Sequence, residues 1–262
     1  MTLNSHIFIP VRLSSQRLPS KHLKHVNGEI ILLKLIKRLK KCQKISKIIV
    51  CTTTDHSDDP LIHLLDKESI LYFRGHKTDI IQRFLDTANF FNTDLIIDVE
   101  GDKIYTDPYF VDNVVTELEK PNIDFVIGND SHQEFNEFNN FISGFIPAGI
   151  KTTALKKLCN IKKSENTETG YREFFTKTKL FNCKYLVPES LQMNSDDVRL
   201  TLDYEEDLQL ATKIFMELGD NFSSKDIVDL LKQKPSLIEI TKPVIKKWNE
   251  HYSNNLTDID LE

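Results

Sequence analysis

The chain has 262 residues, of which 40% are hydrophobic and 28% are charged, and its formal net charge is −5. This size suffices for one large globular domain, and the acidic balance argues against a nucleic-acid duplex as the main partner, because neutralising phosphates needs a basic face. The sequence shows neither 18 consecutive apolar residues nor an apolar N-terminal segment of signal-peptide length, so we expect a cytoplasmic protein without a membrane partner.

The first half of the chain alternates short apolar runs with amphipathic segments. The apolar runs predict strands over residues 7–9, 47–52, 70–73, 95–99 and 124–127. A helical period of apolar residues predicts helices over 30–39, 79–91 and 108–118, and Asp58, Asp59 and Pro60 predict the start of another helix. This alternation favours a mostly parallel sheet with helices on both faces.

The second half of the chain is less regular. Residues 129–145 have no clean period and predict a long loop or a small antiparallel excursion. Strands are expected over 148–152, 183–187 and 198–202, and helices over 168–177, 204–218 and 223–231. The rest of the chain is a polar end that contains Trp248.

The loop that follows the first strand is basic. Residues 12–21 include the cations Arg12, Arg17 and Lys21 and the adjacent hydroxyls of Ser14 and Ser15. Arginine offers forked donors to phosphate oxygens and lysine adds a compact charge, so side chains of this loop could hold a polyphosphate. The loop has no glycine, which excludes a Walker loop and a Gly-rich dinucleotide turn. A solvated loop with capping serines explains the same residues equally well.

Two carboxylates at strand ends could hold a metal ion beside such a polyphosphate. Asp102 follows the strand expected at 95–99, with Gly101 before it to let a ligand come close, and Asp203 ends the strand expected at 198–202. Such positions border the ligand crevice of open α/β sheets, and Mg²⁺ usually takes one or two carboxylates. The alternatives are a turn residue for Asp102 and a helix N-cap for Asp203.

The basic loop also carries a family resemblance. The pattern Pro-x-Arg-x-x-Ser-x-Arg-Leu-Pro-x-Lys-x-Leu is filled by Pro10, Arg12, Ser15, Arg17, Leu18, Pro19, Lys21 and Leu23. It resembles the signature of the cytidylyltransferases that make CMP-activated acidic sugars, including the CMP-Kdo and CMP-sialate synthetases. The likeness extends to Thr52–Thr54, Arg74-Gly75 and Gly101-Asp102, which are most similar to the branch named after a spore-coat polysaccharide protein. It runs to about Leu210 and thins between residues 130 and 195.

This resemblance implies roles for several of the residues above. Asp102 in Gly101-Asp102 and Asp203 in Leu202-Asp203-Tyr-Glu-Glu-Asp207-Leu208, which resembles a late family motif, would be Mg²⁺ ligands. The cytosine and ribose would lie near Arg74 and Asp79, although a turn followed by a capped helix also explains Asp79. His22 shows no partner spacing of a catalytic dyad and is expected at the surface.

The acceptor site is expected in the weakly matching stretch. Lys103 departs from the family pattern, which has Glu or Cys and then Pro after Gly-Asp, so it could alter the acceptor site or weaken the enzyme. Lys103 or Arg172 could meet an anionic group of the acceptor, and Glu168 could face it, although a helix start explains Glu168 and Arg172 as well. Phe141, Phe145 and Pro147 could form a wall over the sugar.

Together, the residues and the resemblance predict an α/β, single-domain fold of the nucleotide-diphospho-sugar transferase type, with a mostly parallel, mixed sheet. Residues 1–220 would form the nucleotidyltransferase domain, with an acceptor-binding excursion at about 129–195, and residues 221–262 a C-terminal helical extension and polar tail. The expected catalytic residues are Arg12, Lys21 and Asp102, and the expected nucleotide-binding residues are Arg12, Ser15, Arg17, Lys21, Arg74 and Asp79.

The expected activity is transfer of CMP from CTP to an acidic sugar, such as Kdo or a nonulosonate, with release of pyrophosphate and with Mg²⁺ as cofactor. A role in surface polysaccharide synthesis and a homodimer are compatible with the resemblance. One alternative is a glycosyltransferase of the same fold, which usually carries an Asp-x-Asp pair, but Asp258 and Asp260 lie in the polar tail. The other is a non-catalytic nucleotide-binding relative, for which Lys103 is the best support.

Overall fold

The computed structural model describes residues 3–128, 142, 144–188, 191, 193 and 197–261. Its main sheet has seven strands in the order β5-β4-β1-β6-β8-β7-β9. The strands are β1 (Ser5–Pro10), β4 (Lys47–Thr53), β5 (Leu71–Gly75), β6 (Leu95–Asp98), β7 (Phe125–Gly128), β8 (Ala148–Lys151) and β9 (Cys183–Leu186). Neighbours pair in parallel except β8, which is antiparallel to both β6 and β7. The predicted mixed, mostly parallel sheet is confirmed.

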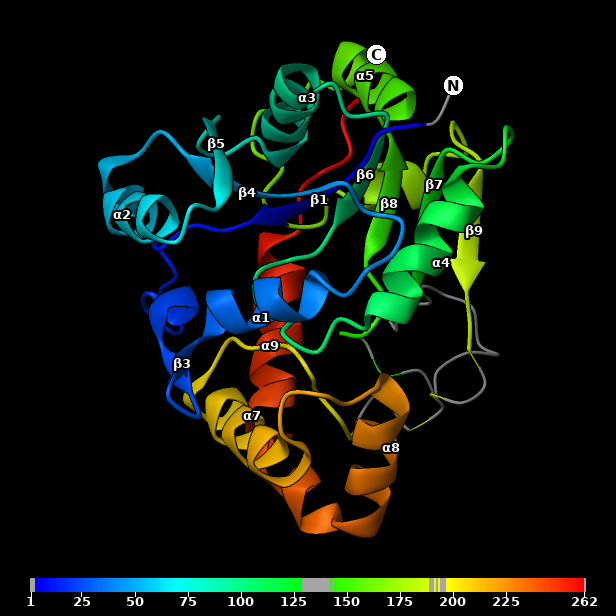
Figure 1. The fold of residues 1–262 in the computed structure, drawn as a ribbon. Coiled ribbons are helices and arrows are strands. Elements are labelled where there is room, and N and C mark those ends of the chain that lie inside the picture. The colour runs from blue at the N-terminus through cyan, green and yellow to red at the C-terminus, as the bar shows by residue number, and fades with distance from the viewer. Residues whose placement is uncertain are drawn as a thin grey trace.

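Helices cover both faces of this sheet, as Figure 1 shows. On one face lie α3 (Ile80–Phe91) and α5 (Thr152–Ile161), and on the other α1 (Ile31–Leu39), α2 (Asp59–Lys67) and α4 (Pro108–Leu118). The central strand β1 serves both layers, because Phe8 packs into the core under α3 while Ile7 and Ile9 pack into the core under α1. This alternation follows from the two-residue period of a strand.

The helices α7 (Glu205–Leu218), α8 (Ser224–Gln233) and η4 (Pro235–Ile240) form a lobe beyond α1 (Figure 1). The last helix, α9 (Lys242–Asn255), leads from this lobe back toward the sheet. Leu261, the last described residue, forms an isolated bridge with Lys162 just after α5. No helix in the described part of the chain is long and apolar enough to cross a membrane.

Three short elements connect the basic loop to α1. The 3-10 helix η1 (Lys21–Leu23) is followed by a two-stranded hairpin of β2 (His25–Val26) and β3 (Glu29–Ile30). Asn27 and Gly28 form its turn with φ of 49° and 78°. This left-handed pair suits the Asn-Gly sequence, because both residues tolerate positive φ. Two other short helices are η2 (His56–Asp58) and α6 (Glu173–Thr176).

Two of the predicted elements are wrong. The helix expected over 168–177 is reduced to α6, because Gly170 adopts φ 83° and the chain turns there. Residues 198–202 form no strand, and Leu202 N–H instead donates to Asp102 O at 3.1 Å. The helices α5 and α9 were not expected. The excursion expected at 129–145 falls mostly outside the described residues, and the domain boundary at 220 stays a prediction.

Candidate active site

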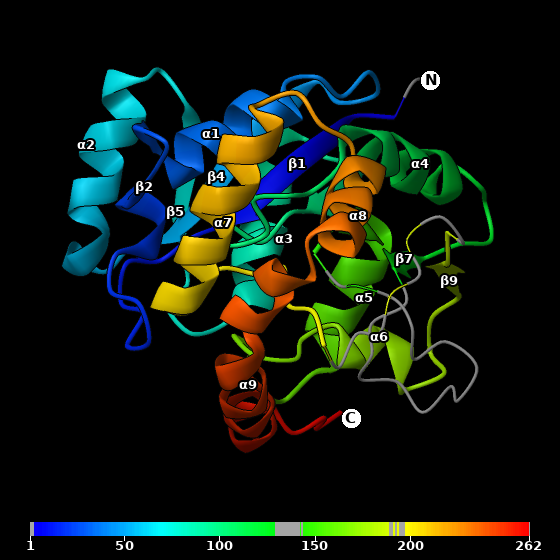
Figure 2. The same ribbon diagram turned by 90° about the horizontal axis from the view of Figure 1, so that it is seen from below.

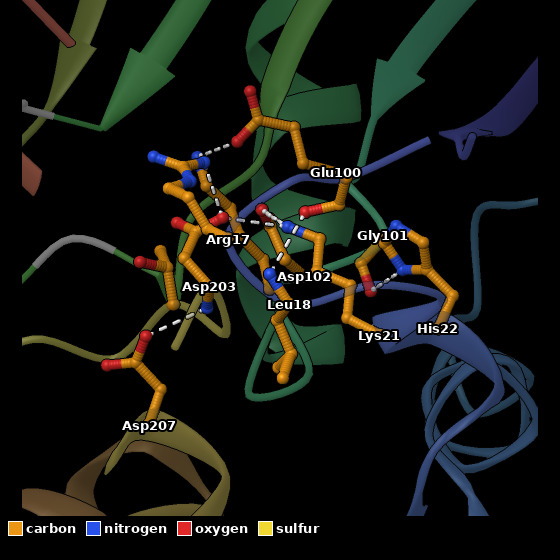
Figure 3. Close-up of polar contacts among 12 residues, drawn as sticks. Arg17, Leu18, Lys21, His22, Glu100, Gly101, Asp102, Asp203 and Asp207 are labelled. Carbon is orange, nitrogen blue, oxygen red and sulfur yellow. Dashed lines mark hydrogen bonds and ion pairs between the residues drawn. The ribbon is translucent and has the colours of Figure 1, made fainter. Parts of the chain in front are cut away.

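Lys21 lies between two carboxylates at the carboxyl end of the central strands. Its Nζ is 2.7 Å from Asp102 Oδ2 and 2.8 Å from Asp203 Oδ1, as Figure 3 shows. The lysine begins η1, Asp102 follows β6, and Asp203 precedes α7, so three separate elements meet at one ammonium. Burial alone would lower the pKa of Lys21, but the two carboxylates outweigh it and raise the pKa. The ammonium is therefore charged at neutral pH.

Asp203 is held by three cations in all. Arg17 Nη2 donates to the same oxygen as Lys21 at 2.7 Å, and Arg199 donates to the other oxygen. Burial would raise the pKa of Asp203, but these three cations together lower it well below its usual range. Asp203 is not the N-cap of helix α7, because that position is Tyr204. Asp207 accepts from the backbone N–H groups of Asp203 and Tyr204 at 2.8 and 2.9 Å. The N-cap interpretation of Asp203 is therefore wrong.

The two carboxylates fit a small, oxygen-liganded cation. Asp102 and Asp203 each place an oxygen within 2.8 Å of one point, which the Lys21 ammonium occupies. The second oxygen of Asp102, Oδ1, is buried and has no hydrogen-bond partner within the described part of the chain. A buried carboxylate oxygen without a partner is costly, and a hard cation such as Mg²⁺ satisfies it. Among the described residues no larger group of His, Cys, Asp and Glu is arranged to hold a metal.

The basic loop is tied to the sheet by Asp58. Its carboxylate accepts from Leu13 N–H at 2.8 Å and from the hydroxyls of Thr52 and Thr53 at the end of β4. The Ser15 hydroxyl caps the turn by accepting from Leu18 N–H at 3.4 Å. The loop therefore has a defined conformation, which is what presentation of its cations to a ligand requires.

Gly101 provides close packing rather than room for a ligand. A Cβ at this position would lie 2.8 Å from Val11 Cγ2 and 2.9 Å from His22 Cε1. His22, expected at the surface, is buried, and burial lowers its pKa to about 3. The neutral ring donates from Nδ1 to Gly101 O at 3.2 Å (Figure 3). The Gly-Asp loop is thereby fixed against η1, which carries Lys21.

A second charged cluster contains two of the expected acceptor residues. Arg172 Nη2 lies 2.8 Å from Asp98 and 3.0 Å from Glu100 Oε1, and Lys103 Nζ lies 2.8 Å from Glu100 Oε2. Burial would raise the pKa of Glu100, but Arg172 and Lys103 lower it to about 2. Glu100 is therefore charged and compensates both cations. Tyr171 donates a short hydrogen bond to the same Asp98 oxygen that Arg172 contacts.

The third acceptor candidate, Glu168, pairs with one exposed and one buried arginine. Its Oε2 lies 3.5 Å from Arg12 Nε, and its Oε1 lies 2.8 Å from Arg83 Nη2. The Arg12 side chain is 44% exposed, whereas that of Arg83 is only 2% exposed. Arg12 therefore pairs with Glu168 at the start of the basic loop, and much of its side chain remains exposed and accessible to a ligand.

Arg74 and Asp79 are occupied by other parts of the chain. Arg74 donates to Thr53 O and Asp55 O, each at 2.8 Å, and pairs with Asp59 at the same distance. Asp79 is the buried N-cap of α3, where it accepts from Gln82 N–H and from the Thr167 hydroxyl and pairs with Lys162. Their nucleotide-binding roles stay predictions.

Of the aromatic wall expected over the sugar, Phe145 and Pro147 are buried, so they present no surface to a ligand, and Phe141 lies outside the described residues. Arg199, which pairs with Asp203, was not predicted from the sequence. Little in the sequence indicated this contact, because in the strand expected over 198–202 the apolar residues Val198, Leu200 and Leu202 share one face and Arg199 lies on the other.

A family model described as cytidylyltransferase matches residues 6–217. The chain belongs to the cytidylyltransferase family. It is therefore a nucleotidyltransferase, and the fold and family expected from its sequence are confirmed. The match includes every candidate residue named so far, from Arg12 to Asp203.

Relatives in sequence differ in how much of this chain they match. An uncharacterized protein of Methanocaldococcus jannaschii is 29% identical over 245 residues, which cover 91% of this chain and 95% of the relative. A 3-deoxy-manno-octulosonate cytidylyltransferase of Legionella pneumophila (strain Lens) is 28% identical over 122 residues, which cover 46% of this chain and 48% of the relative. The likeness to an enzyme of named substrate is therefore confined to about half of each chain.

Solved structures agree with the fold. A cytidylyltransferase from Leptospira borgpetersenii superposes with a TM-score of 0.76 at 26% identity, covering 91% of this chain and 97% of the other. A CMP:2-keto-3-deoxy-manno-octonic acid synthetase complexed with CTP gives a TM-score of 0.59 at 12% identity, covering 82% and 99%. At that identity the second structure shows a shared fold only.

Proposed function

We propose that this cytidylyltransferase transfers CMP from CTP to an acidic sugar, such as Kdo or a nonulosonate, for surface polysaccharide synthesis. The observation that carries the proposal is the meeting of Lys21 with Asp102 and Asp203, with Arg17 on the same Asp203 oxygen. Cations that can grip a triphosphate and carboxylates that can hold its metal ion lie at one point. The family membership supports this interpretation, and the Legionella relative supports the choice of a sugar acid.

In the proposed reaction a hydroxyl oxygen of the sugar forms a bond to the α-phosphorus of CTP. The bond from that phosphorus to the oxygen bridging the β-phosphate breaks, pyrophosphate leaves with the electron pair, and the hydroxyl proton is released. Lys21, Arg17 and Arg12 would hold the β- and γ-phosphates and stabilise the charge that develops on the departing pyrophosphate. Asp102 and Asp203 would hold Mg²⁺, which when bound neutralises charge on the α-phosphate.

The charged cluster beside the site supports an anionic acceptor. Arg172 and Lys103 both lie on Glu100, whose side chain is 36% exposed. A carboxylate of the sugar could replace Glu100 between these two cations, because it offers the same two oxygens. This arrangement also compensates the charge of Lys103, so the residue that departs from the family pattern is no argument against activity.

The test is pyrophosphate release from CTP and Mg²⁺ with a panel of 3-deoxy-2-keto sugar acids. Neutral sugars of matched size and sugar phosphates serve as comparison acceptors. We expect release with at least one sugar acid and none with the neutral sugars. Turnover with neutral sugars alone would refute the anionic acceptor, and silence across the panel together with no CTP binding in calorimetry would refute the proposed function.

A further inference from the structure

The end of the chain returns to the candidate site from outside the stretch that the family model matches. Helix α9 leaves the lobe of α7 and α8, and the segment after it reaches the α5 and α6 side of the sheet (Figures 1 and 2). Residues 242–261, here called the C-terminal clasp, lie beyond residue 217, where the family match ends.

One half of the clasp contacts the residue that holds Asp203. The Arg199 guanidinium lies over the Trp248 ring at 5.2 Å from its centroid. The same guanidinium donates to Asp203 Oδ2 and to Asp207, and its side chain is only 6% exposed. A guanidinium over an indole gains a cation–π attraction that grows as water is excluded. Trp248 is therefore linked to Asp203 through one intermediate side chain.

The other half of the clasp contacts the segment that holds Glu168. Thr257 N–H donates to Thr169 O at 3.0 Å, and Lys163 N–H donates to Asp260 O at 2.9 Å. A Cβ on Gly170 would lie 2.3 Å from Leu256 Cδ1, so the absent side chain makes the space that Leu256 fills. This segment carries Glu168, the partner of Arg12, directly beside these contacts.

We infer that the C-terminal clasp is a part of the active site, joining the Asp203 side to the Glu168 side, with Trp248 as a positioning residue for Asp203. This builds on the proposed function, since Asp203 is taken as a ligand of the nucleotide-bound metal. Trp248 touches neither nucleotide nor metal in this scheme and acts through Arg199. Its loss should therefore weaken binding of Mg²⁺-CTP without unfolding the site.

The experiment compares Trp248→Leu, Trp248→Phe and, as a matched control, Lys247→Ala at the exposed neighbouring position. Calorimetry measures the Kd of Mg²⁺-CTP, and circular dichroism checks the fold. We expect a two- to tenfold weaker Kd in Trp248→Leu, the range of a partly exposed cation–π contact, and near-complete recovery in Trp248→Phe, because Phe keeps the aromatic face. A Trp248→Leu protein that binds as tightly as Lys247→Ala would overturn the inference.

A second measurement needs no nucleotide. Trp248 is the only tryptophan of the chain, so tryptophan emission reports its surroundings alone. Asp203→Asn removes a charge that anchors Arg199, whereas Asp102 pairs with Lys21 and not with Arg199, so Asp102→Asn is the control. We expect a shifted emission only in Asp203→Asn. If the unmodified protein fails to bind CTP, the proposed function fails, and the emission alone then decides: a shift supports the clasp, and unchanged emission overturns it.

Discussion

Replacing Lys21 by Ala removes the ammonium that Asp102 and Asp203 share. A lysine in a loop is expected to be exposed, but the Lys21 side chain is only 9% exposed and that of Asp203 only 3%. Removing one partner of a buried ion pair costs about 3–5 kcal/mol, because the other charge is left uncompensated. Asp203 keeps Arg17 and Arg199. We therefore expect a loss near the lower limit, about 3 kcal/mol of unfolding free energy.

Mg²⁺ should restore part of this stability. With the ammonium gone, the two carboxylates can share a divalent cation, and a ligand at 100 times its Kd adds about 2.7 kcal/mol to the folded state. The unmodified protein should respond less, because its own ammonium already lies between the carboxylates. Turnover should fall by about 10²–10³, as for other donors that stabilise developing charge.

Urea unfolding with and without Mg²⁺ measures both effects. The matched control is Lys24→Ala, because Lys24 lies three residues on, is 37% exposed and reaches Glu205 only at 3.9 Å. Exposed pairs of that kind contribute about 0–1 kcal/mol. If Lys21→Ala is as stable as Lys24→Ala and gains nothing more from Mg²⁺ than the unmodified protein, then Lys21 does not bridge the two carboxylates.

Three further predictions concern single side chains. Asp102→Asn and Asp203→Asn should each lower Mg²⁺-dependent pyrophosphate release by at least about 10²-fold, since the neutral amide lacks the carboxylate charge that would hold Mg²⁺; full activity in both variants would place the metal elsewhere. Glu100→Gln should lower the KM for an anionic acceptor while leaving kcat nearly unchanged, because Arg172 and Lys103 lose the carboxylate that competes with it; a raised KM in steady-state kinetics would argue that Glu100 itself binds the acceptor. Burial and the nearby Lys47 lower the pKa of His6 to about 4, although Asp94 raises it. Between pH 6.5 and pH 4 the unfolded chain therefore takes up a proton at His6 that the folded chain does not. Stability should therefore fall by about 1.5 kcal/mol from pH 6.5 to pH 5 on account of this group, and urea unfolding of His6→Asn should lack that share; identical pH slopes would rule it out.

The strands of the sheet could be predicted from the local spacing of apolar residues, but the segments that pack beside the sheet could not. The runs around Ile7, Val50 and Ile97 are apolar on both sides because helices cover both faces of the sheet, so their strands were readable. The run at 198–202 alternates apolar and polar residues, as a strand with one buried face does, yet it lies against the Gly-Asp loop and pairs with no strand among the described residues. The spacing of apolar residues indicates which positions are buried, but it does not indicate which neighbouring segment supplies the backbone hydrogen bonds.

The candidate site was predictable as far as the local sequence and the family motifs reached. Lys21 was named from the basic loop and Asp102 and Asp203 from expected strand ends, and the structure brings the three together. The partners of these residues were not, because Arg199 and Trp248 are chosen by tertiary packing. Lys103 pairs locally with Glu100, three residues before it, whereas Arg172 reaches the same carboxylate from a segment that is distant in the sequence.

A crystal structure with CTP and Mn²⁺ in place of Mg²⁺ tests the central claim most directly. The anomalous signal of Mn²⁺ locates the cation independently of the surrounding density. We predict a cation bound by Asp102 and Asp203, with the triphosphate along Arg12, Arg17 and Lys21 at the end of β1. A triphosphate bound elsewhere, or Mn²⁺ held without either carboxylate, would contradict this assignment of the site.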